Sequence, residues 1–171
     1  MAIPTFNKLW ASYPDRKSME KRCFNKQKTW QKLFDNYCAI SLSESFIRSG
    51  ILVSHAPGNK CWSHSGARHL LLAEDFAKWL KTSPPPGFGK MEEIPPQNFQ
   101  SLLKGRTGVI FFKDYYQRGS QKFANRTGDH IDLWNKNKII SSSMWWRSVI
   151  EFFNIVSDLN ASKKIWFWEV K

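Results

Sequence analysis

Three residues have the types and settings of a thiol nucleophile with its base. Cys38 stands at the expected start of a helix, where free backbone amides and the helix dipole stabilise a thiolate, and Asp35 or Asn36 is expected to cap that helix. His130 lies on an expected strand, with Asp132 two residues later on the same face. A thiol at a helix start facing an imidazole on a sheet is an arrangement that activates cysteine nucleophiles. The plainer interpretation of Cys38 is a small buried apolar residue, which is the commoner role of free cysteines.

Other chemistry-bearing residues lead to weaker hypotheses. Cys61, His64 and His69 resemble half of a metal site, but zinc needs three or four ligands and a fourth is missing nearby. We therefore expect a structural role for the two histidines, and neither a metal nor a cofactor. Glu92 and Glu93 are adjacent, and adjacent carboxylates rarely bracket one glycosidic bond, so both are expected to be solvated.

Length and composition indicate one soluble globular domain over residues 1–171. The chain has 26 Lys and Arg against 14 Asp and Glu, a formal net charge of +12, and 42% hydrophobic residues, which excludes a disordered chain. No apolar run approaches the roughly 20 residues of a membrane span, so membrane insertion is not expected. The first eight residues show no signal-peptide pattern, and export without a cleaved leader is expected.

The positive charge implies affinity for polyanions without identifying one. Basic residues alternate with Phe24 and Trp30, a pattern that suits single-stranded nucleic acid. No nucleic-acid motif accompanies them, so a solvated basic face is the preferred interpretation. The basic residues concerned are Lys17, Lys21, Arg22, Lys26 and Lys28.

Local patterns predict an α+β fold, with helices in the first half and an antiparallel meander in the second. Gly105 marks the boundary between the helical half and the strand-rich half, and the Pro84–Gly87 stretch ends the last long helix of the helical half. The expected helices cover 5–12, 28–35, 38–48, 66–81, a short turn after Pro96 with Phe99, Leu102 and Leu103 inward, and 144–153. The expected strands cover 107–112, 130–134, 139–140 and 164–170, the first of them central.

Several blocks in order resemble one known family. They are Asn36–Ser43 around Cys38, Cys61–His69, Gly108–Phe112, Gly128–Asn135 around His130, and the closing Trp166-Phe167-Trp168. Together they resemble the fourth family of type VI secretion amidase effectors over nearly the whole chain.

The resemblance implies a papain-like (NlpC-like) cysteine peptidase fold. It also implies cleavage of peptidoglycan stem peptides between γ-D-glutamate and meso-diaminopimelate, with Cys38 as nucleophile and His130 as general base. The family places an acidic residue eleven positions after this histidine to orient the imidazole, and here that position is Ser141, which carries no charge. Ser141 is thus the positional match and Asp132 the chemical alternative.

The resemblance further implies an immunity protein that plugs the cleft with an acidic loop, loading into the type VI apparatus, and action in the periplasm of a target bacterium. The alternative from another class is a basic module that binds cell wall or nucleic acid without catalysis. Since three cysteines leave at least one thiol free, Cys23 and Cys61, if close in space, are expected to pair in an oxidising compartment and leave Cys38 free.

Overall fold

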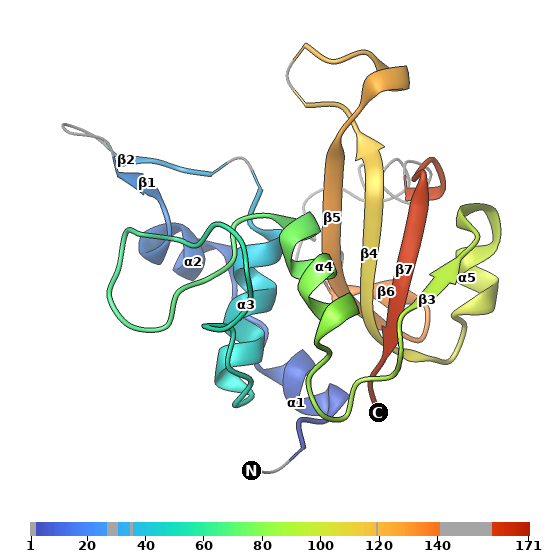
Figure 1. Cartoon of the computed structure of the whole chain (residues 1–171), viewed down its shortest axis with the longest axis horizontal. Coiled ribbons are helices and arrows are strands. Elements are labelled where there is room, and N and C mark those ends of the chain that lie inside the picture. Colours follow the sequence, from blue (N-terminus) through green and yellow to red (C-terminus); the bar gives the residue numbers. More distant parts are fainter. Residues whose placement is uncertain (1–2, 27–30, 35, 119, 141–158) are drawn as a thin grey trace. The chain divides into compact units, whose positions relative to one another are not determined.

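The computed structural model describes residues 3–26, 31–34, 36–118, 120–140 and 159–171 (Figure 1). The chain divides into two compact units, Met1–Gly87 and Phe88–Lys171, which we describe separately. The single domain over 1–171 stays a prediction. Among the described residues, no helix combines the length and the apolar character that a membrane crossing requires.

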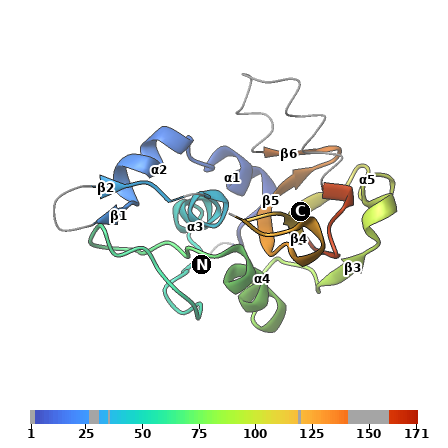
Figure 2. The same ribbon diagram turned by 90° about the horizontal axis from the view of Figure 1, so that it is seen from above.

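The first unit is built around a buried helix. Its elements are α1 (Phe6–Ala11), α2 (Arg16–Arg22), the hairpin β1 (Asn25–Lys26) and β2 (Gln31–Lys32), α3 (Cys38–Arg48) and α4 (Ala73–Thr82). Every residue of α3 from Ala39 to Phe46 is buried, and Ser45 donates a hydrogen bond to the carbonyl of Leu9 in α1. Figure 2 shows α3 end-on, with α1 and α2 on one side of it. The predicted helices over 5–12 and 38–48 are confirmed.

The helix predicted over 28–35 is wrong at Gln31 and Lys32, which pair with Lys26 and Asn25 in an antiparallel hairpin, and its residues 28–30 and 35 lie outside the described residues. Helix α2 was not predicted. It holds a single buried residue, Met19, so it has almost no hydrophobic periodicity, and its start is marked only by Asp15, whose side chain accepts from the Ser18 amide.

The helix predicted over 66–81 begins seven residues later, at Ala73. The residues before it bind a neighbouring loop: the carbonyl of His69 accepts from the Cys61 amide at 2.8 Å, and the Leu71 amide donates to Asn59 at 2.9 Å. These cross-loop hydrogen bonds occupy backbone groups that a helix would use. The predicted inward residues of α4 are buried, as expected for its apolar face.

The second unit contains a five-stranded antiparallel sheet in the order β3-β7-β4-β5-β6. Its strands are β3 (Glu92–Ile94), β4 (Thr107–Tyr116), β5 (Gly128–Asn135), β6 (Lys138–Ile139) and β7 (Lys164–Glu169). The predicted strands are confirmed and β4 is central. The predicted meander is correct for β4, β5 and β6 only, because the last strand, β7, inserts between β3 and β4. Glu92 and Glu93, which are expected to be solvated, lie on β3.

A short helical turn closes one side of this sheet. It consists of a 3-10 turn (Pro96–Asn98) and α5 (Phe99–Leu102), and both views place α5 next to β3 (Figures 1 and 2). Phe99 and Leu103 are buried as predicted and pack with Phe112 and Trp134, whereas Leu102 is 50% exposed, contrary to the prediction. A second 3-10 turn covers Phe123–Asn125. The helix predicted over 144–153 lies outside the described residues.

Candidate active site

Cys38 is the first residue of α3, as the sequence predicts. Its side chain is partly exposed, whereas the eight residues that follow it are buried. Tyr37 is the cap residue and its side chain makes no capping hydrogen bond; instead, Asn36 accepts from the Cys38 amide at 2.9 Å. The predicted cap at Asn36 thus supplies its oxygen from one position further out, and Asp35 lies outside the described residues.

The side chain of Tyr37 anchors the start of α3. This side chain is 4% exposed, and its hydroxyl donates to the carbonyl of Cys23 at 2.7 Å. Because Tyr37 directly precedes Cys38, the contact fixes where the helix begins and holds the cysteine at its exposed tip.

His130 lies near the start of β5 in the second unit, beside a carboxylate. Its Nε2 is 3.2 Å from Oδ2 of Asp132, and the His130 side chain is 12% exposed while that of Asp132 is fully buried. The second oxygen, Oδ1 of Asp132, accepts from the amide of Leu133 at 2.9 Å. This hydrogen bond orients the Asp132 carboxylate so that its other oxygen reaches His130, although the two residues are only two positions apart on one strand.

The strand next to His130 carries a bulge. The pairing of β4 with β5 is regular up to Phe112, opposite His130, and then shifts before Tyr116 pairs with Gly128. Asp114 within the bulge has a φ of 52°, and its amide donates to buried Asp129 at 2.8 Å. Bulges often lie beside active sites, where they redirect a side chain.

Two aromatic rings flank the imidazole of His130. The ring of Phe112 is stacked with a centroid distance of 6.3 Å, and the ring of Tyr115 meets it edge-on at 6.1 Å. Gly128 lies against the ring and carbonyl of Tyr116, with no room for a Cβ, so the backbones of β4 and β5 approach closely beside His130. The rings shield the imidazole from water on these sides.

Of the four residues that the sequence singles out, the structure brings His130 and Asp132 together. Ser141 lies outside the described residues. Cys38 belongs to the first compact unit and the His130–Asp132 pair to the second, so the couple of thiol and imidazole is taken up as a proposal below.

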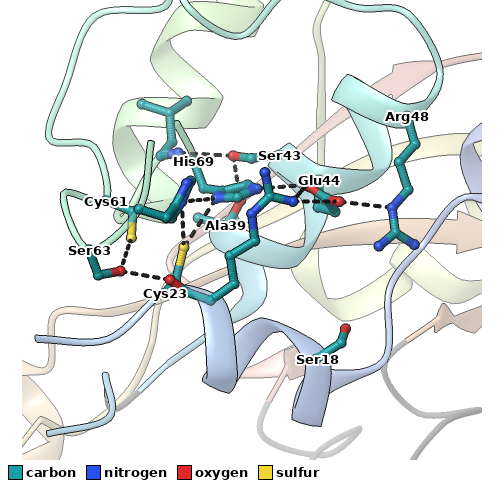
Figure 3. A network of polar contacts seen from close by, with 12 residues as sticks. Ser18, Cys23, Ala39, Ser43, Glu44, Arg48, Cys61, Ser63 and His69 are labelled. Atoms are coloured by element: carbon teal, nitrogen blue, oxygen red, sulfur yellow. Dashed lines mark hydrogen bonds and ion pairs between the residues drawn. The ribbon is translucent and has the colours of Figure 1, made fainter. Parts of the chain in front are cut away.

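A second group of thiols and imidazoles lies inside the first unit (Figure 3). We call Cys23, Cys61, His64 and His69 the thiol–imidazole cluster. The sulfur of Cys23 is 3.3 Å from Nε2 of His64 and 3.1 Å from Nδ1 of His69, and these two nitrogens are 3.1 Å apart. The sulfur of Cys61 lies within 4.8 Å of the Cys23 sulfur and of the His64 nitrogen. Cys23, at the end of α2, is therefore the additional potential ligand that the segment 61–69 lacks.

Glu44 of α3 anchors this cluster. Its side chain, 5% exposed, accepts from Nε2 of His69 at 2.7 Å, from Arg48 at 2.8 Å and from Arg22 at 3.1 and 3.2 Å. Burial alone would raise the pKa of Glu44, but these hydrogen bonds outweigh it and lower the pKa. Arg22, expected on a solvated face, is thus bound to a buried carboxylate, while Lys17 and Lys21 are exposed as predicted.

The two cysteines of the cluster influence each other. Contact with Cys23 lowers the pKa of Cys61, and contact with Cys61 together with burial raises the pKa of Cys23. Both thiols are free in this structure, as is that of Cys38. Their proximity meets the geometric condition of the predicted disulfide, whose formation stays a prediction.

Two further features lie apart from these groups. A hollow of about 380 Å³ in the first unit is lined by apolar residues of the N-terminal segment, of 50–52 and of Pro84–Pro86, and it includes no predicted catalytic residue. Glu92, expected to be solvated, receives hydrogen bonds from Arg106 at 2.5 and 3.0 Å, and Arg106 also binds Glu169. Glu93 is exposed, as expected.

Comparison with solved structures supports the fold. The effector–immunity system Tae4/Tai4 from Salmonella typhimurium matches with a TM-score of 0.63 at 16% identity, covering 99% of this chain and 100% of that chain. The complex Tae4–Tai4 from Enterobacter cloacae matches with a TM-score of 0.62 at 18% identity and the same coverage, and the effector Tae4 from Enterobacter cloacae with 0.60 at 19%, covering 99% and 98%. The predicted fold class, α+β of the papain-like type, is thereby confirmed.

Comparison of sequences identifies the family. No curated protein sequence matches the chain significantly. The family model for type VI secretion system (T6SS) amidase effector protein 4, Tae4, matches residues 34–168, which include both Cys38 and His130. The chain therefore belongs to the Tae4 family of type VI secretion amidase effectors, which are antibacterial and act on peptidoglycan.

Proposed function

We propose that this chain cleaves peptidoglycan stem peptides between γ-D-glutamate and meso-diaminopimelate, using Cys38 as nucleophile and His130 as general base. The family match supports amide hydrolysis. The observation that carries the mechanism is the 3.2 Å contact between Nε2 of His130 and the buried carboxylate of Asp132, because a catalytic imidazole needs a partner that fixes its orientation and tautomer.

The proposed reaction proceeds through a thioester. The Cys38 thiolate attacks the amide carbonyl carbon, a C–S bond forms, and the protonated His130 gives its proton to the leaving amine as the C–N bond breaks. A water molecule then loses a proton to His130 and attacks the thioester, which releases the glutamyl carboxylate and restores the thiol. With Nε2 held by Asp132, the nitrogen that exchanges these protons is Nδ1.

The reactivity of Cys38 follows from its place in the fold. A thiol at the first position of an eleven-residue helix lies where the helix dipole favours an anion, and partial exposure lets a substrate reach it. The amide of Cys38 is a candidate donor to the oxyanion. In the resting structure that amide donates to Asn36, so the substrate oxygen has to displace the Asn36 oxygen.

We propose Asp132, rather than Ser141, as the residue that orients His130. A carboxylate stabilises the imidazolium that forms when the thiol loses its proton, whereas a serine hydroxyl carries no charge. Asp132 holds this orientation because its other oxygen is fixed by the Leu133 amide.

The setting of this activity follows from the family. As a type VI effector, the chain is expected to be loaded into the secretion apparatus and to reach the peptidoglycan in the periplasm of a target bacterium. The matching structures include effectors in complex with an immunity protein, Tai4. We propose a cognate immunity protein for this chain as well, with acidic groups that complement its net charge of +12.

Digestion of purified sacculi tests the function. Wild-type protein is expected to release peptides with new γ-D-glutamyl carboxyl ends and new diaminopimelate amino ends, identified by mass spectrometry. Cys38→Ala is expected to release none, and His55→Ala, which changes an exposed histidine, is expected to behave as wild type. Binding to sacculi without products would support the non-catalytic wall-binding module, and products with other ends would refute the assigned bond.

A further inference from the structure

The thiol–imidazole cluster holds four potential metal-ligand atoms, each within hydrogen-bond distance or 4.8 Å of at least two of the others. They are the sulfurs of Cys23 and Cys61, Nε2 of His64 and Nδ1 of His69. They come from the end of α2 and from the loop before α4, and Figure 3 labels Cys23, Cys61 and His69 among them. Cys23, Cys61 and His69 are fully buried, so the point on which the atoms converge is screened from solvent.

The spacing of three of these atoms, the Cys23 sulfur and the two imidazole nitrogens, matches the edges of a small tetrahedron. With Zn–N bonds of about 2.0 Å and Zn–S bonds of about 2.3 Å, tetrahedral geometry separates two nitrogens by about 3.3 Å and a nitrogen from a sulfur by about 3.5 Å. The observed separations are 3.1 Å between the nitrogens, and 3.1 and 3.3 Å from the Cys23 sulfur to each nitrogen. An outward shift of these three atoms by a few tenths of an ångström admits the ion, and the Cys61 sulfur, which lies within 4.8 Å of the Cys23 sulfur and of the His64 nitrogen, is the fourth ligand atom.

The outer nitrogens of both imidazoles are already committed as donors. Nδ1 of His64 lies 2.9 Å from the carbonyl oxygen of Ser65, and Nε2 of His69 lies 2.7 Å from the carboxylate of Glu44. Since a carbonyl and a carboxylate only accept, both of these nitrogens carry protons. In the neutral rings, Nε2 of His64 and Nδ1 of His69 then present lone pairs to each other at 3.1 Å. A cation between them removes that repulsion.

The groups around the cluster resemble the outer shell of a metal site. A histidine ligand commonly donates its other N–H to a carboxylate or a backbone carbonyl, which fixes the ring and makes it a better ligand. Glu44 plays this part for His69 and is itself held by Arg22 and Arg48. On the sulfur side, Ser63 lies 3.1 Å from the Cys61 sulfur and donates to the carbonyl of Arg22.

The cluster lies where it can anchor a long connection without regular secondary structure. Residues 49–72 contain no helix or strand apart from one isolated bridge between Lys60 and Leu70, and a connection of this length needs some anchor. The buried core at this place is small, consisting of Met19, Cys23, Tyr37, Ile40 and Cys61. A tie between Cys23 and the 61–69 segment fastens the long loop to α2 and, through Glu44, to α3.

We propose that Cys23, Cys61, His64 and His69 bind one structural Zn²⁺ in a tetrahedral Cys2His2 site. Two sulfurs with two imidazole nitrogens are a typical zinc ligand set. Both thiols release their protons to solvent when the metal binds, and the two thiolates neutralise its charge. With four protein ligands the coordination is closed, so the ion has no open position for a substrate and its role is to hold the fold. This inference is independent of the proposed reaction at Cys38.

Metal analysis of the purified chain tests the site. The wild-type protein, purified without chelators or loaded with Zn²⁺ alone, is expected to contain one zinc per chain. X-ray absorption is expected to show two sulfur and two nitrogen neighbours at about 2.3 and 2.0 Å. Cys23→Ser and Cys61→Ser are expected to lose the metal, whereas Cys38→Ser, the matched control, is expected to keep it.

The wild-type measurements alone decide the matter if the ligand variants fail to fold. Zinc bound with a different neighbour set, or zinc retained in a folded Cys61→Ser variant, would overturn the proposal. A protein that takes up no zinc also overturns it. Thiol counting then shows which alternative holds: one free thiol indicates the Cys23–Cys61 disulfide, and three indicate a metal-free cluster.

Glu44→Gln tests the outer shell without removing a ligand. Losing the carboxylate that orients His69 is expected to weaken zinc binding about 10- to 100-fold, measured by competition with a chromophoric chelator. Glu20→Gln removes a carboxylate that binds Arg16 on α2 and serves as the matched control. Equal zinc affinity in both variants would show that Glu44 does not support a metal site.

Discussion

Cys38 and Cys61 belong to the same compact unit but have opposite surroundings. Cys61 is fully buried, its sulfur contacts Ser63, and the thiol–imidazole cluster surrounds it. Cys38 is partly exposed at the tip of α3. A thiol enclosed by potential ligands is suited to hold a metal, whereas a thiol at an exposed helix start is suited to attack a substrate. Residue type alone therefore does not distinguish the two cysteines, but burial and neighbours do.

The histidines of the two groups repeat this contrast. His69 is fully buried and donates to Glu44, a carboxylate bound by two arginines. His130 is 12% exposed and contacts Asp132, whose other oxygen binds a backbone amide. In both places a carboxylate fixes one ring nitrogen and directs the other. The two histidines differ in the surroundings of the other ring nitrogen. In His69 this nitrogen faces the closed thiol–imidazole cluster, whereas His130 has a partly exposed ring.

The largest effect on activity is expected from substituting Cys38, and the contrast with Cys61 is drawn by substituting each cysteine alone. Cys38→Ser is expected to lower kcat/KM on a muropeptide about 1,000-fold or more, because a serine hydroxyl at this site remains protonated, while its melting temperature stays near that of wild type. Cys61→Ser is expected to affect stability rather than reactivity. Its melting temperature should be lower than that of wild type, while Cys38 stays reactive toward iodoacetamide in the folded fraction. Wild-type turnover by Cys38→Ser would remove the distinction between the two thiols.

Asp132→Asn sharpens the comparison of the carboxylates. The amide oxygen can still accept from Leu133, so the strand is expected to remain folded, but the charge that stabilises imidazolium is lost. We expect kcat to fall about 100-fold, a typical contribution of an acid–base partner. Ser141→Ala is the companion variant and is expected to change kcat less than about threefold. A large loss with Ser141→Ala and none with Asp132→Asn would assign the orienting role to Ser141 instead.

Gly128→Ala tests how the backbone supports His130. A Cβ at this position would overlap the ring and carbonyl of Tyr116, so β4 and β5 have to separate beside the bulge. We expect a loss of about 2 kcal/mol in unfolding free energy, in the range for overpacking, measured by urea denaturation. Gly50→Ala is a control in open space, although its φ of 88° adds backbone strain of its own. A Gly128→Ala protein as stable as wild type would show that this contact does not constrain the strand.

The sequence predicts those parts of the fold that depend on local hydrophobic patterns. The helix over 38–48 and the strand over 107–112 carry unbroken apolar faces, and both are confirmed. Helix α2 buries Met19 alone, so its pattern gave no signal beyond the cap at Asp15. The start of α4 was misplaced because the hydrogen bonds that keep 66–72 out of the helix come from the distant loop at Asn59 and Cys61.

For the candidate sites, too, the sequence predicts what depends on local patterns and not what depends on long-range contacts. His130 and Asp132 lie on one strand, so their alternation could reveal a shared face, and Cys38 follows from its helix start. Cys23 could not be joined to His64 and His69 from sequence, because it ends a helix that local patterns did not reveal. The residue that we propose to complete the half-site is thus a long-range contact, as is the insertion of β7 between β3 and β4.

Asn36→Ala should have a modest effect that distinguishes the reactive cysteine from the buried one. Losing the acceptor of the Cys38 amide is expected to lower the unfolding free energy by about 1 kcal/mol, as for other helix-start hydrogen bonds, measured by thermal unfolding. Because the amide no longer has to leave Asn36, kcat is expected not to fall. A fall in kcat beyond the fraction unfolded would show that Asn36 itself contacts the substrate.

The smallest effect concerns a carboxylate outside both cysteine groups. The hydrogen bonds from Arg106 lower the pKa of Glu92, and partial burial opposes them only in part. Since the folded pKa lies below the unfolded value near 4.5, the contribution to stability is present above that value and is lost as the pH falls through the folded pKa. Glu92 is 44% exposed on its side chain, so solvent screening limits the contribution to about 0.5 kcal/mol. Glu92→Gln is therefore expected to lower the melting temperature slightly at pH 7, and its difference from wild type is expected to shrink as the pH falls below 4.5, with Glu93→Gln as the neighbouring control. If the difference from wild type stays the same as the pH falls, the loss comes from packing around Arg106 rather than from the charge of Glu92.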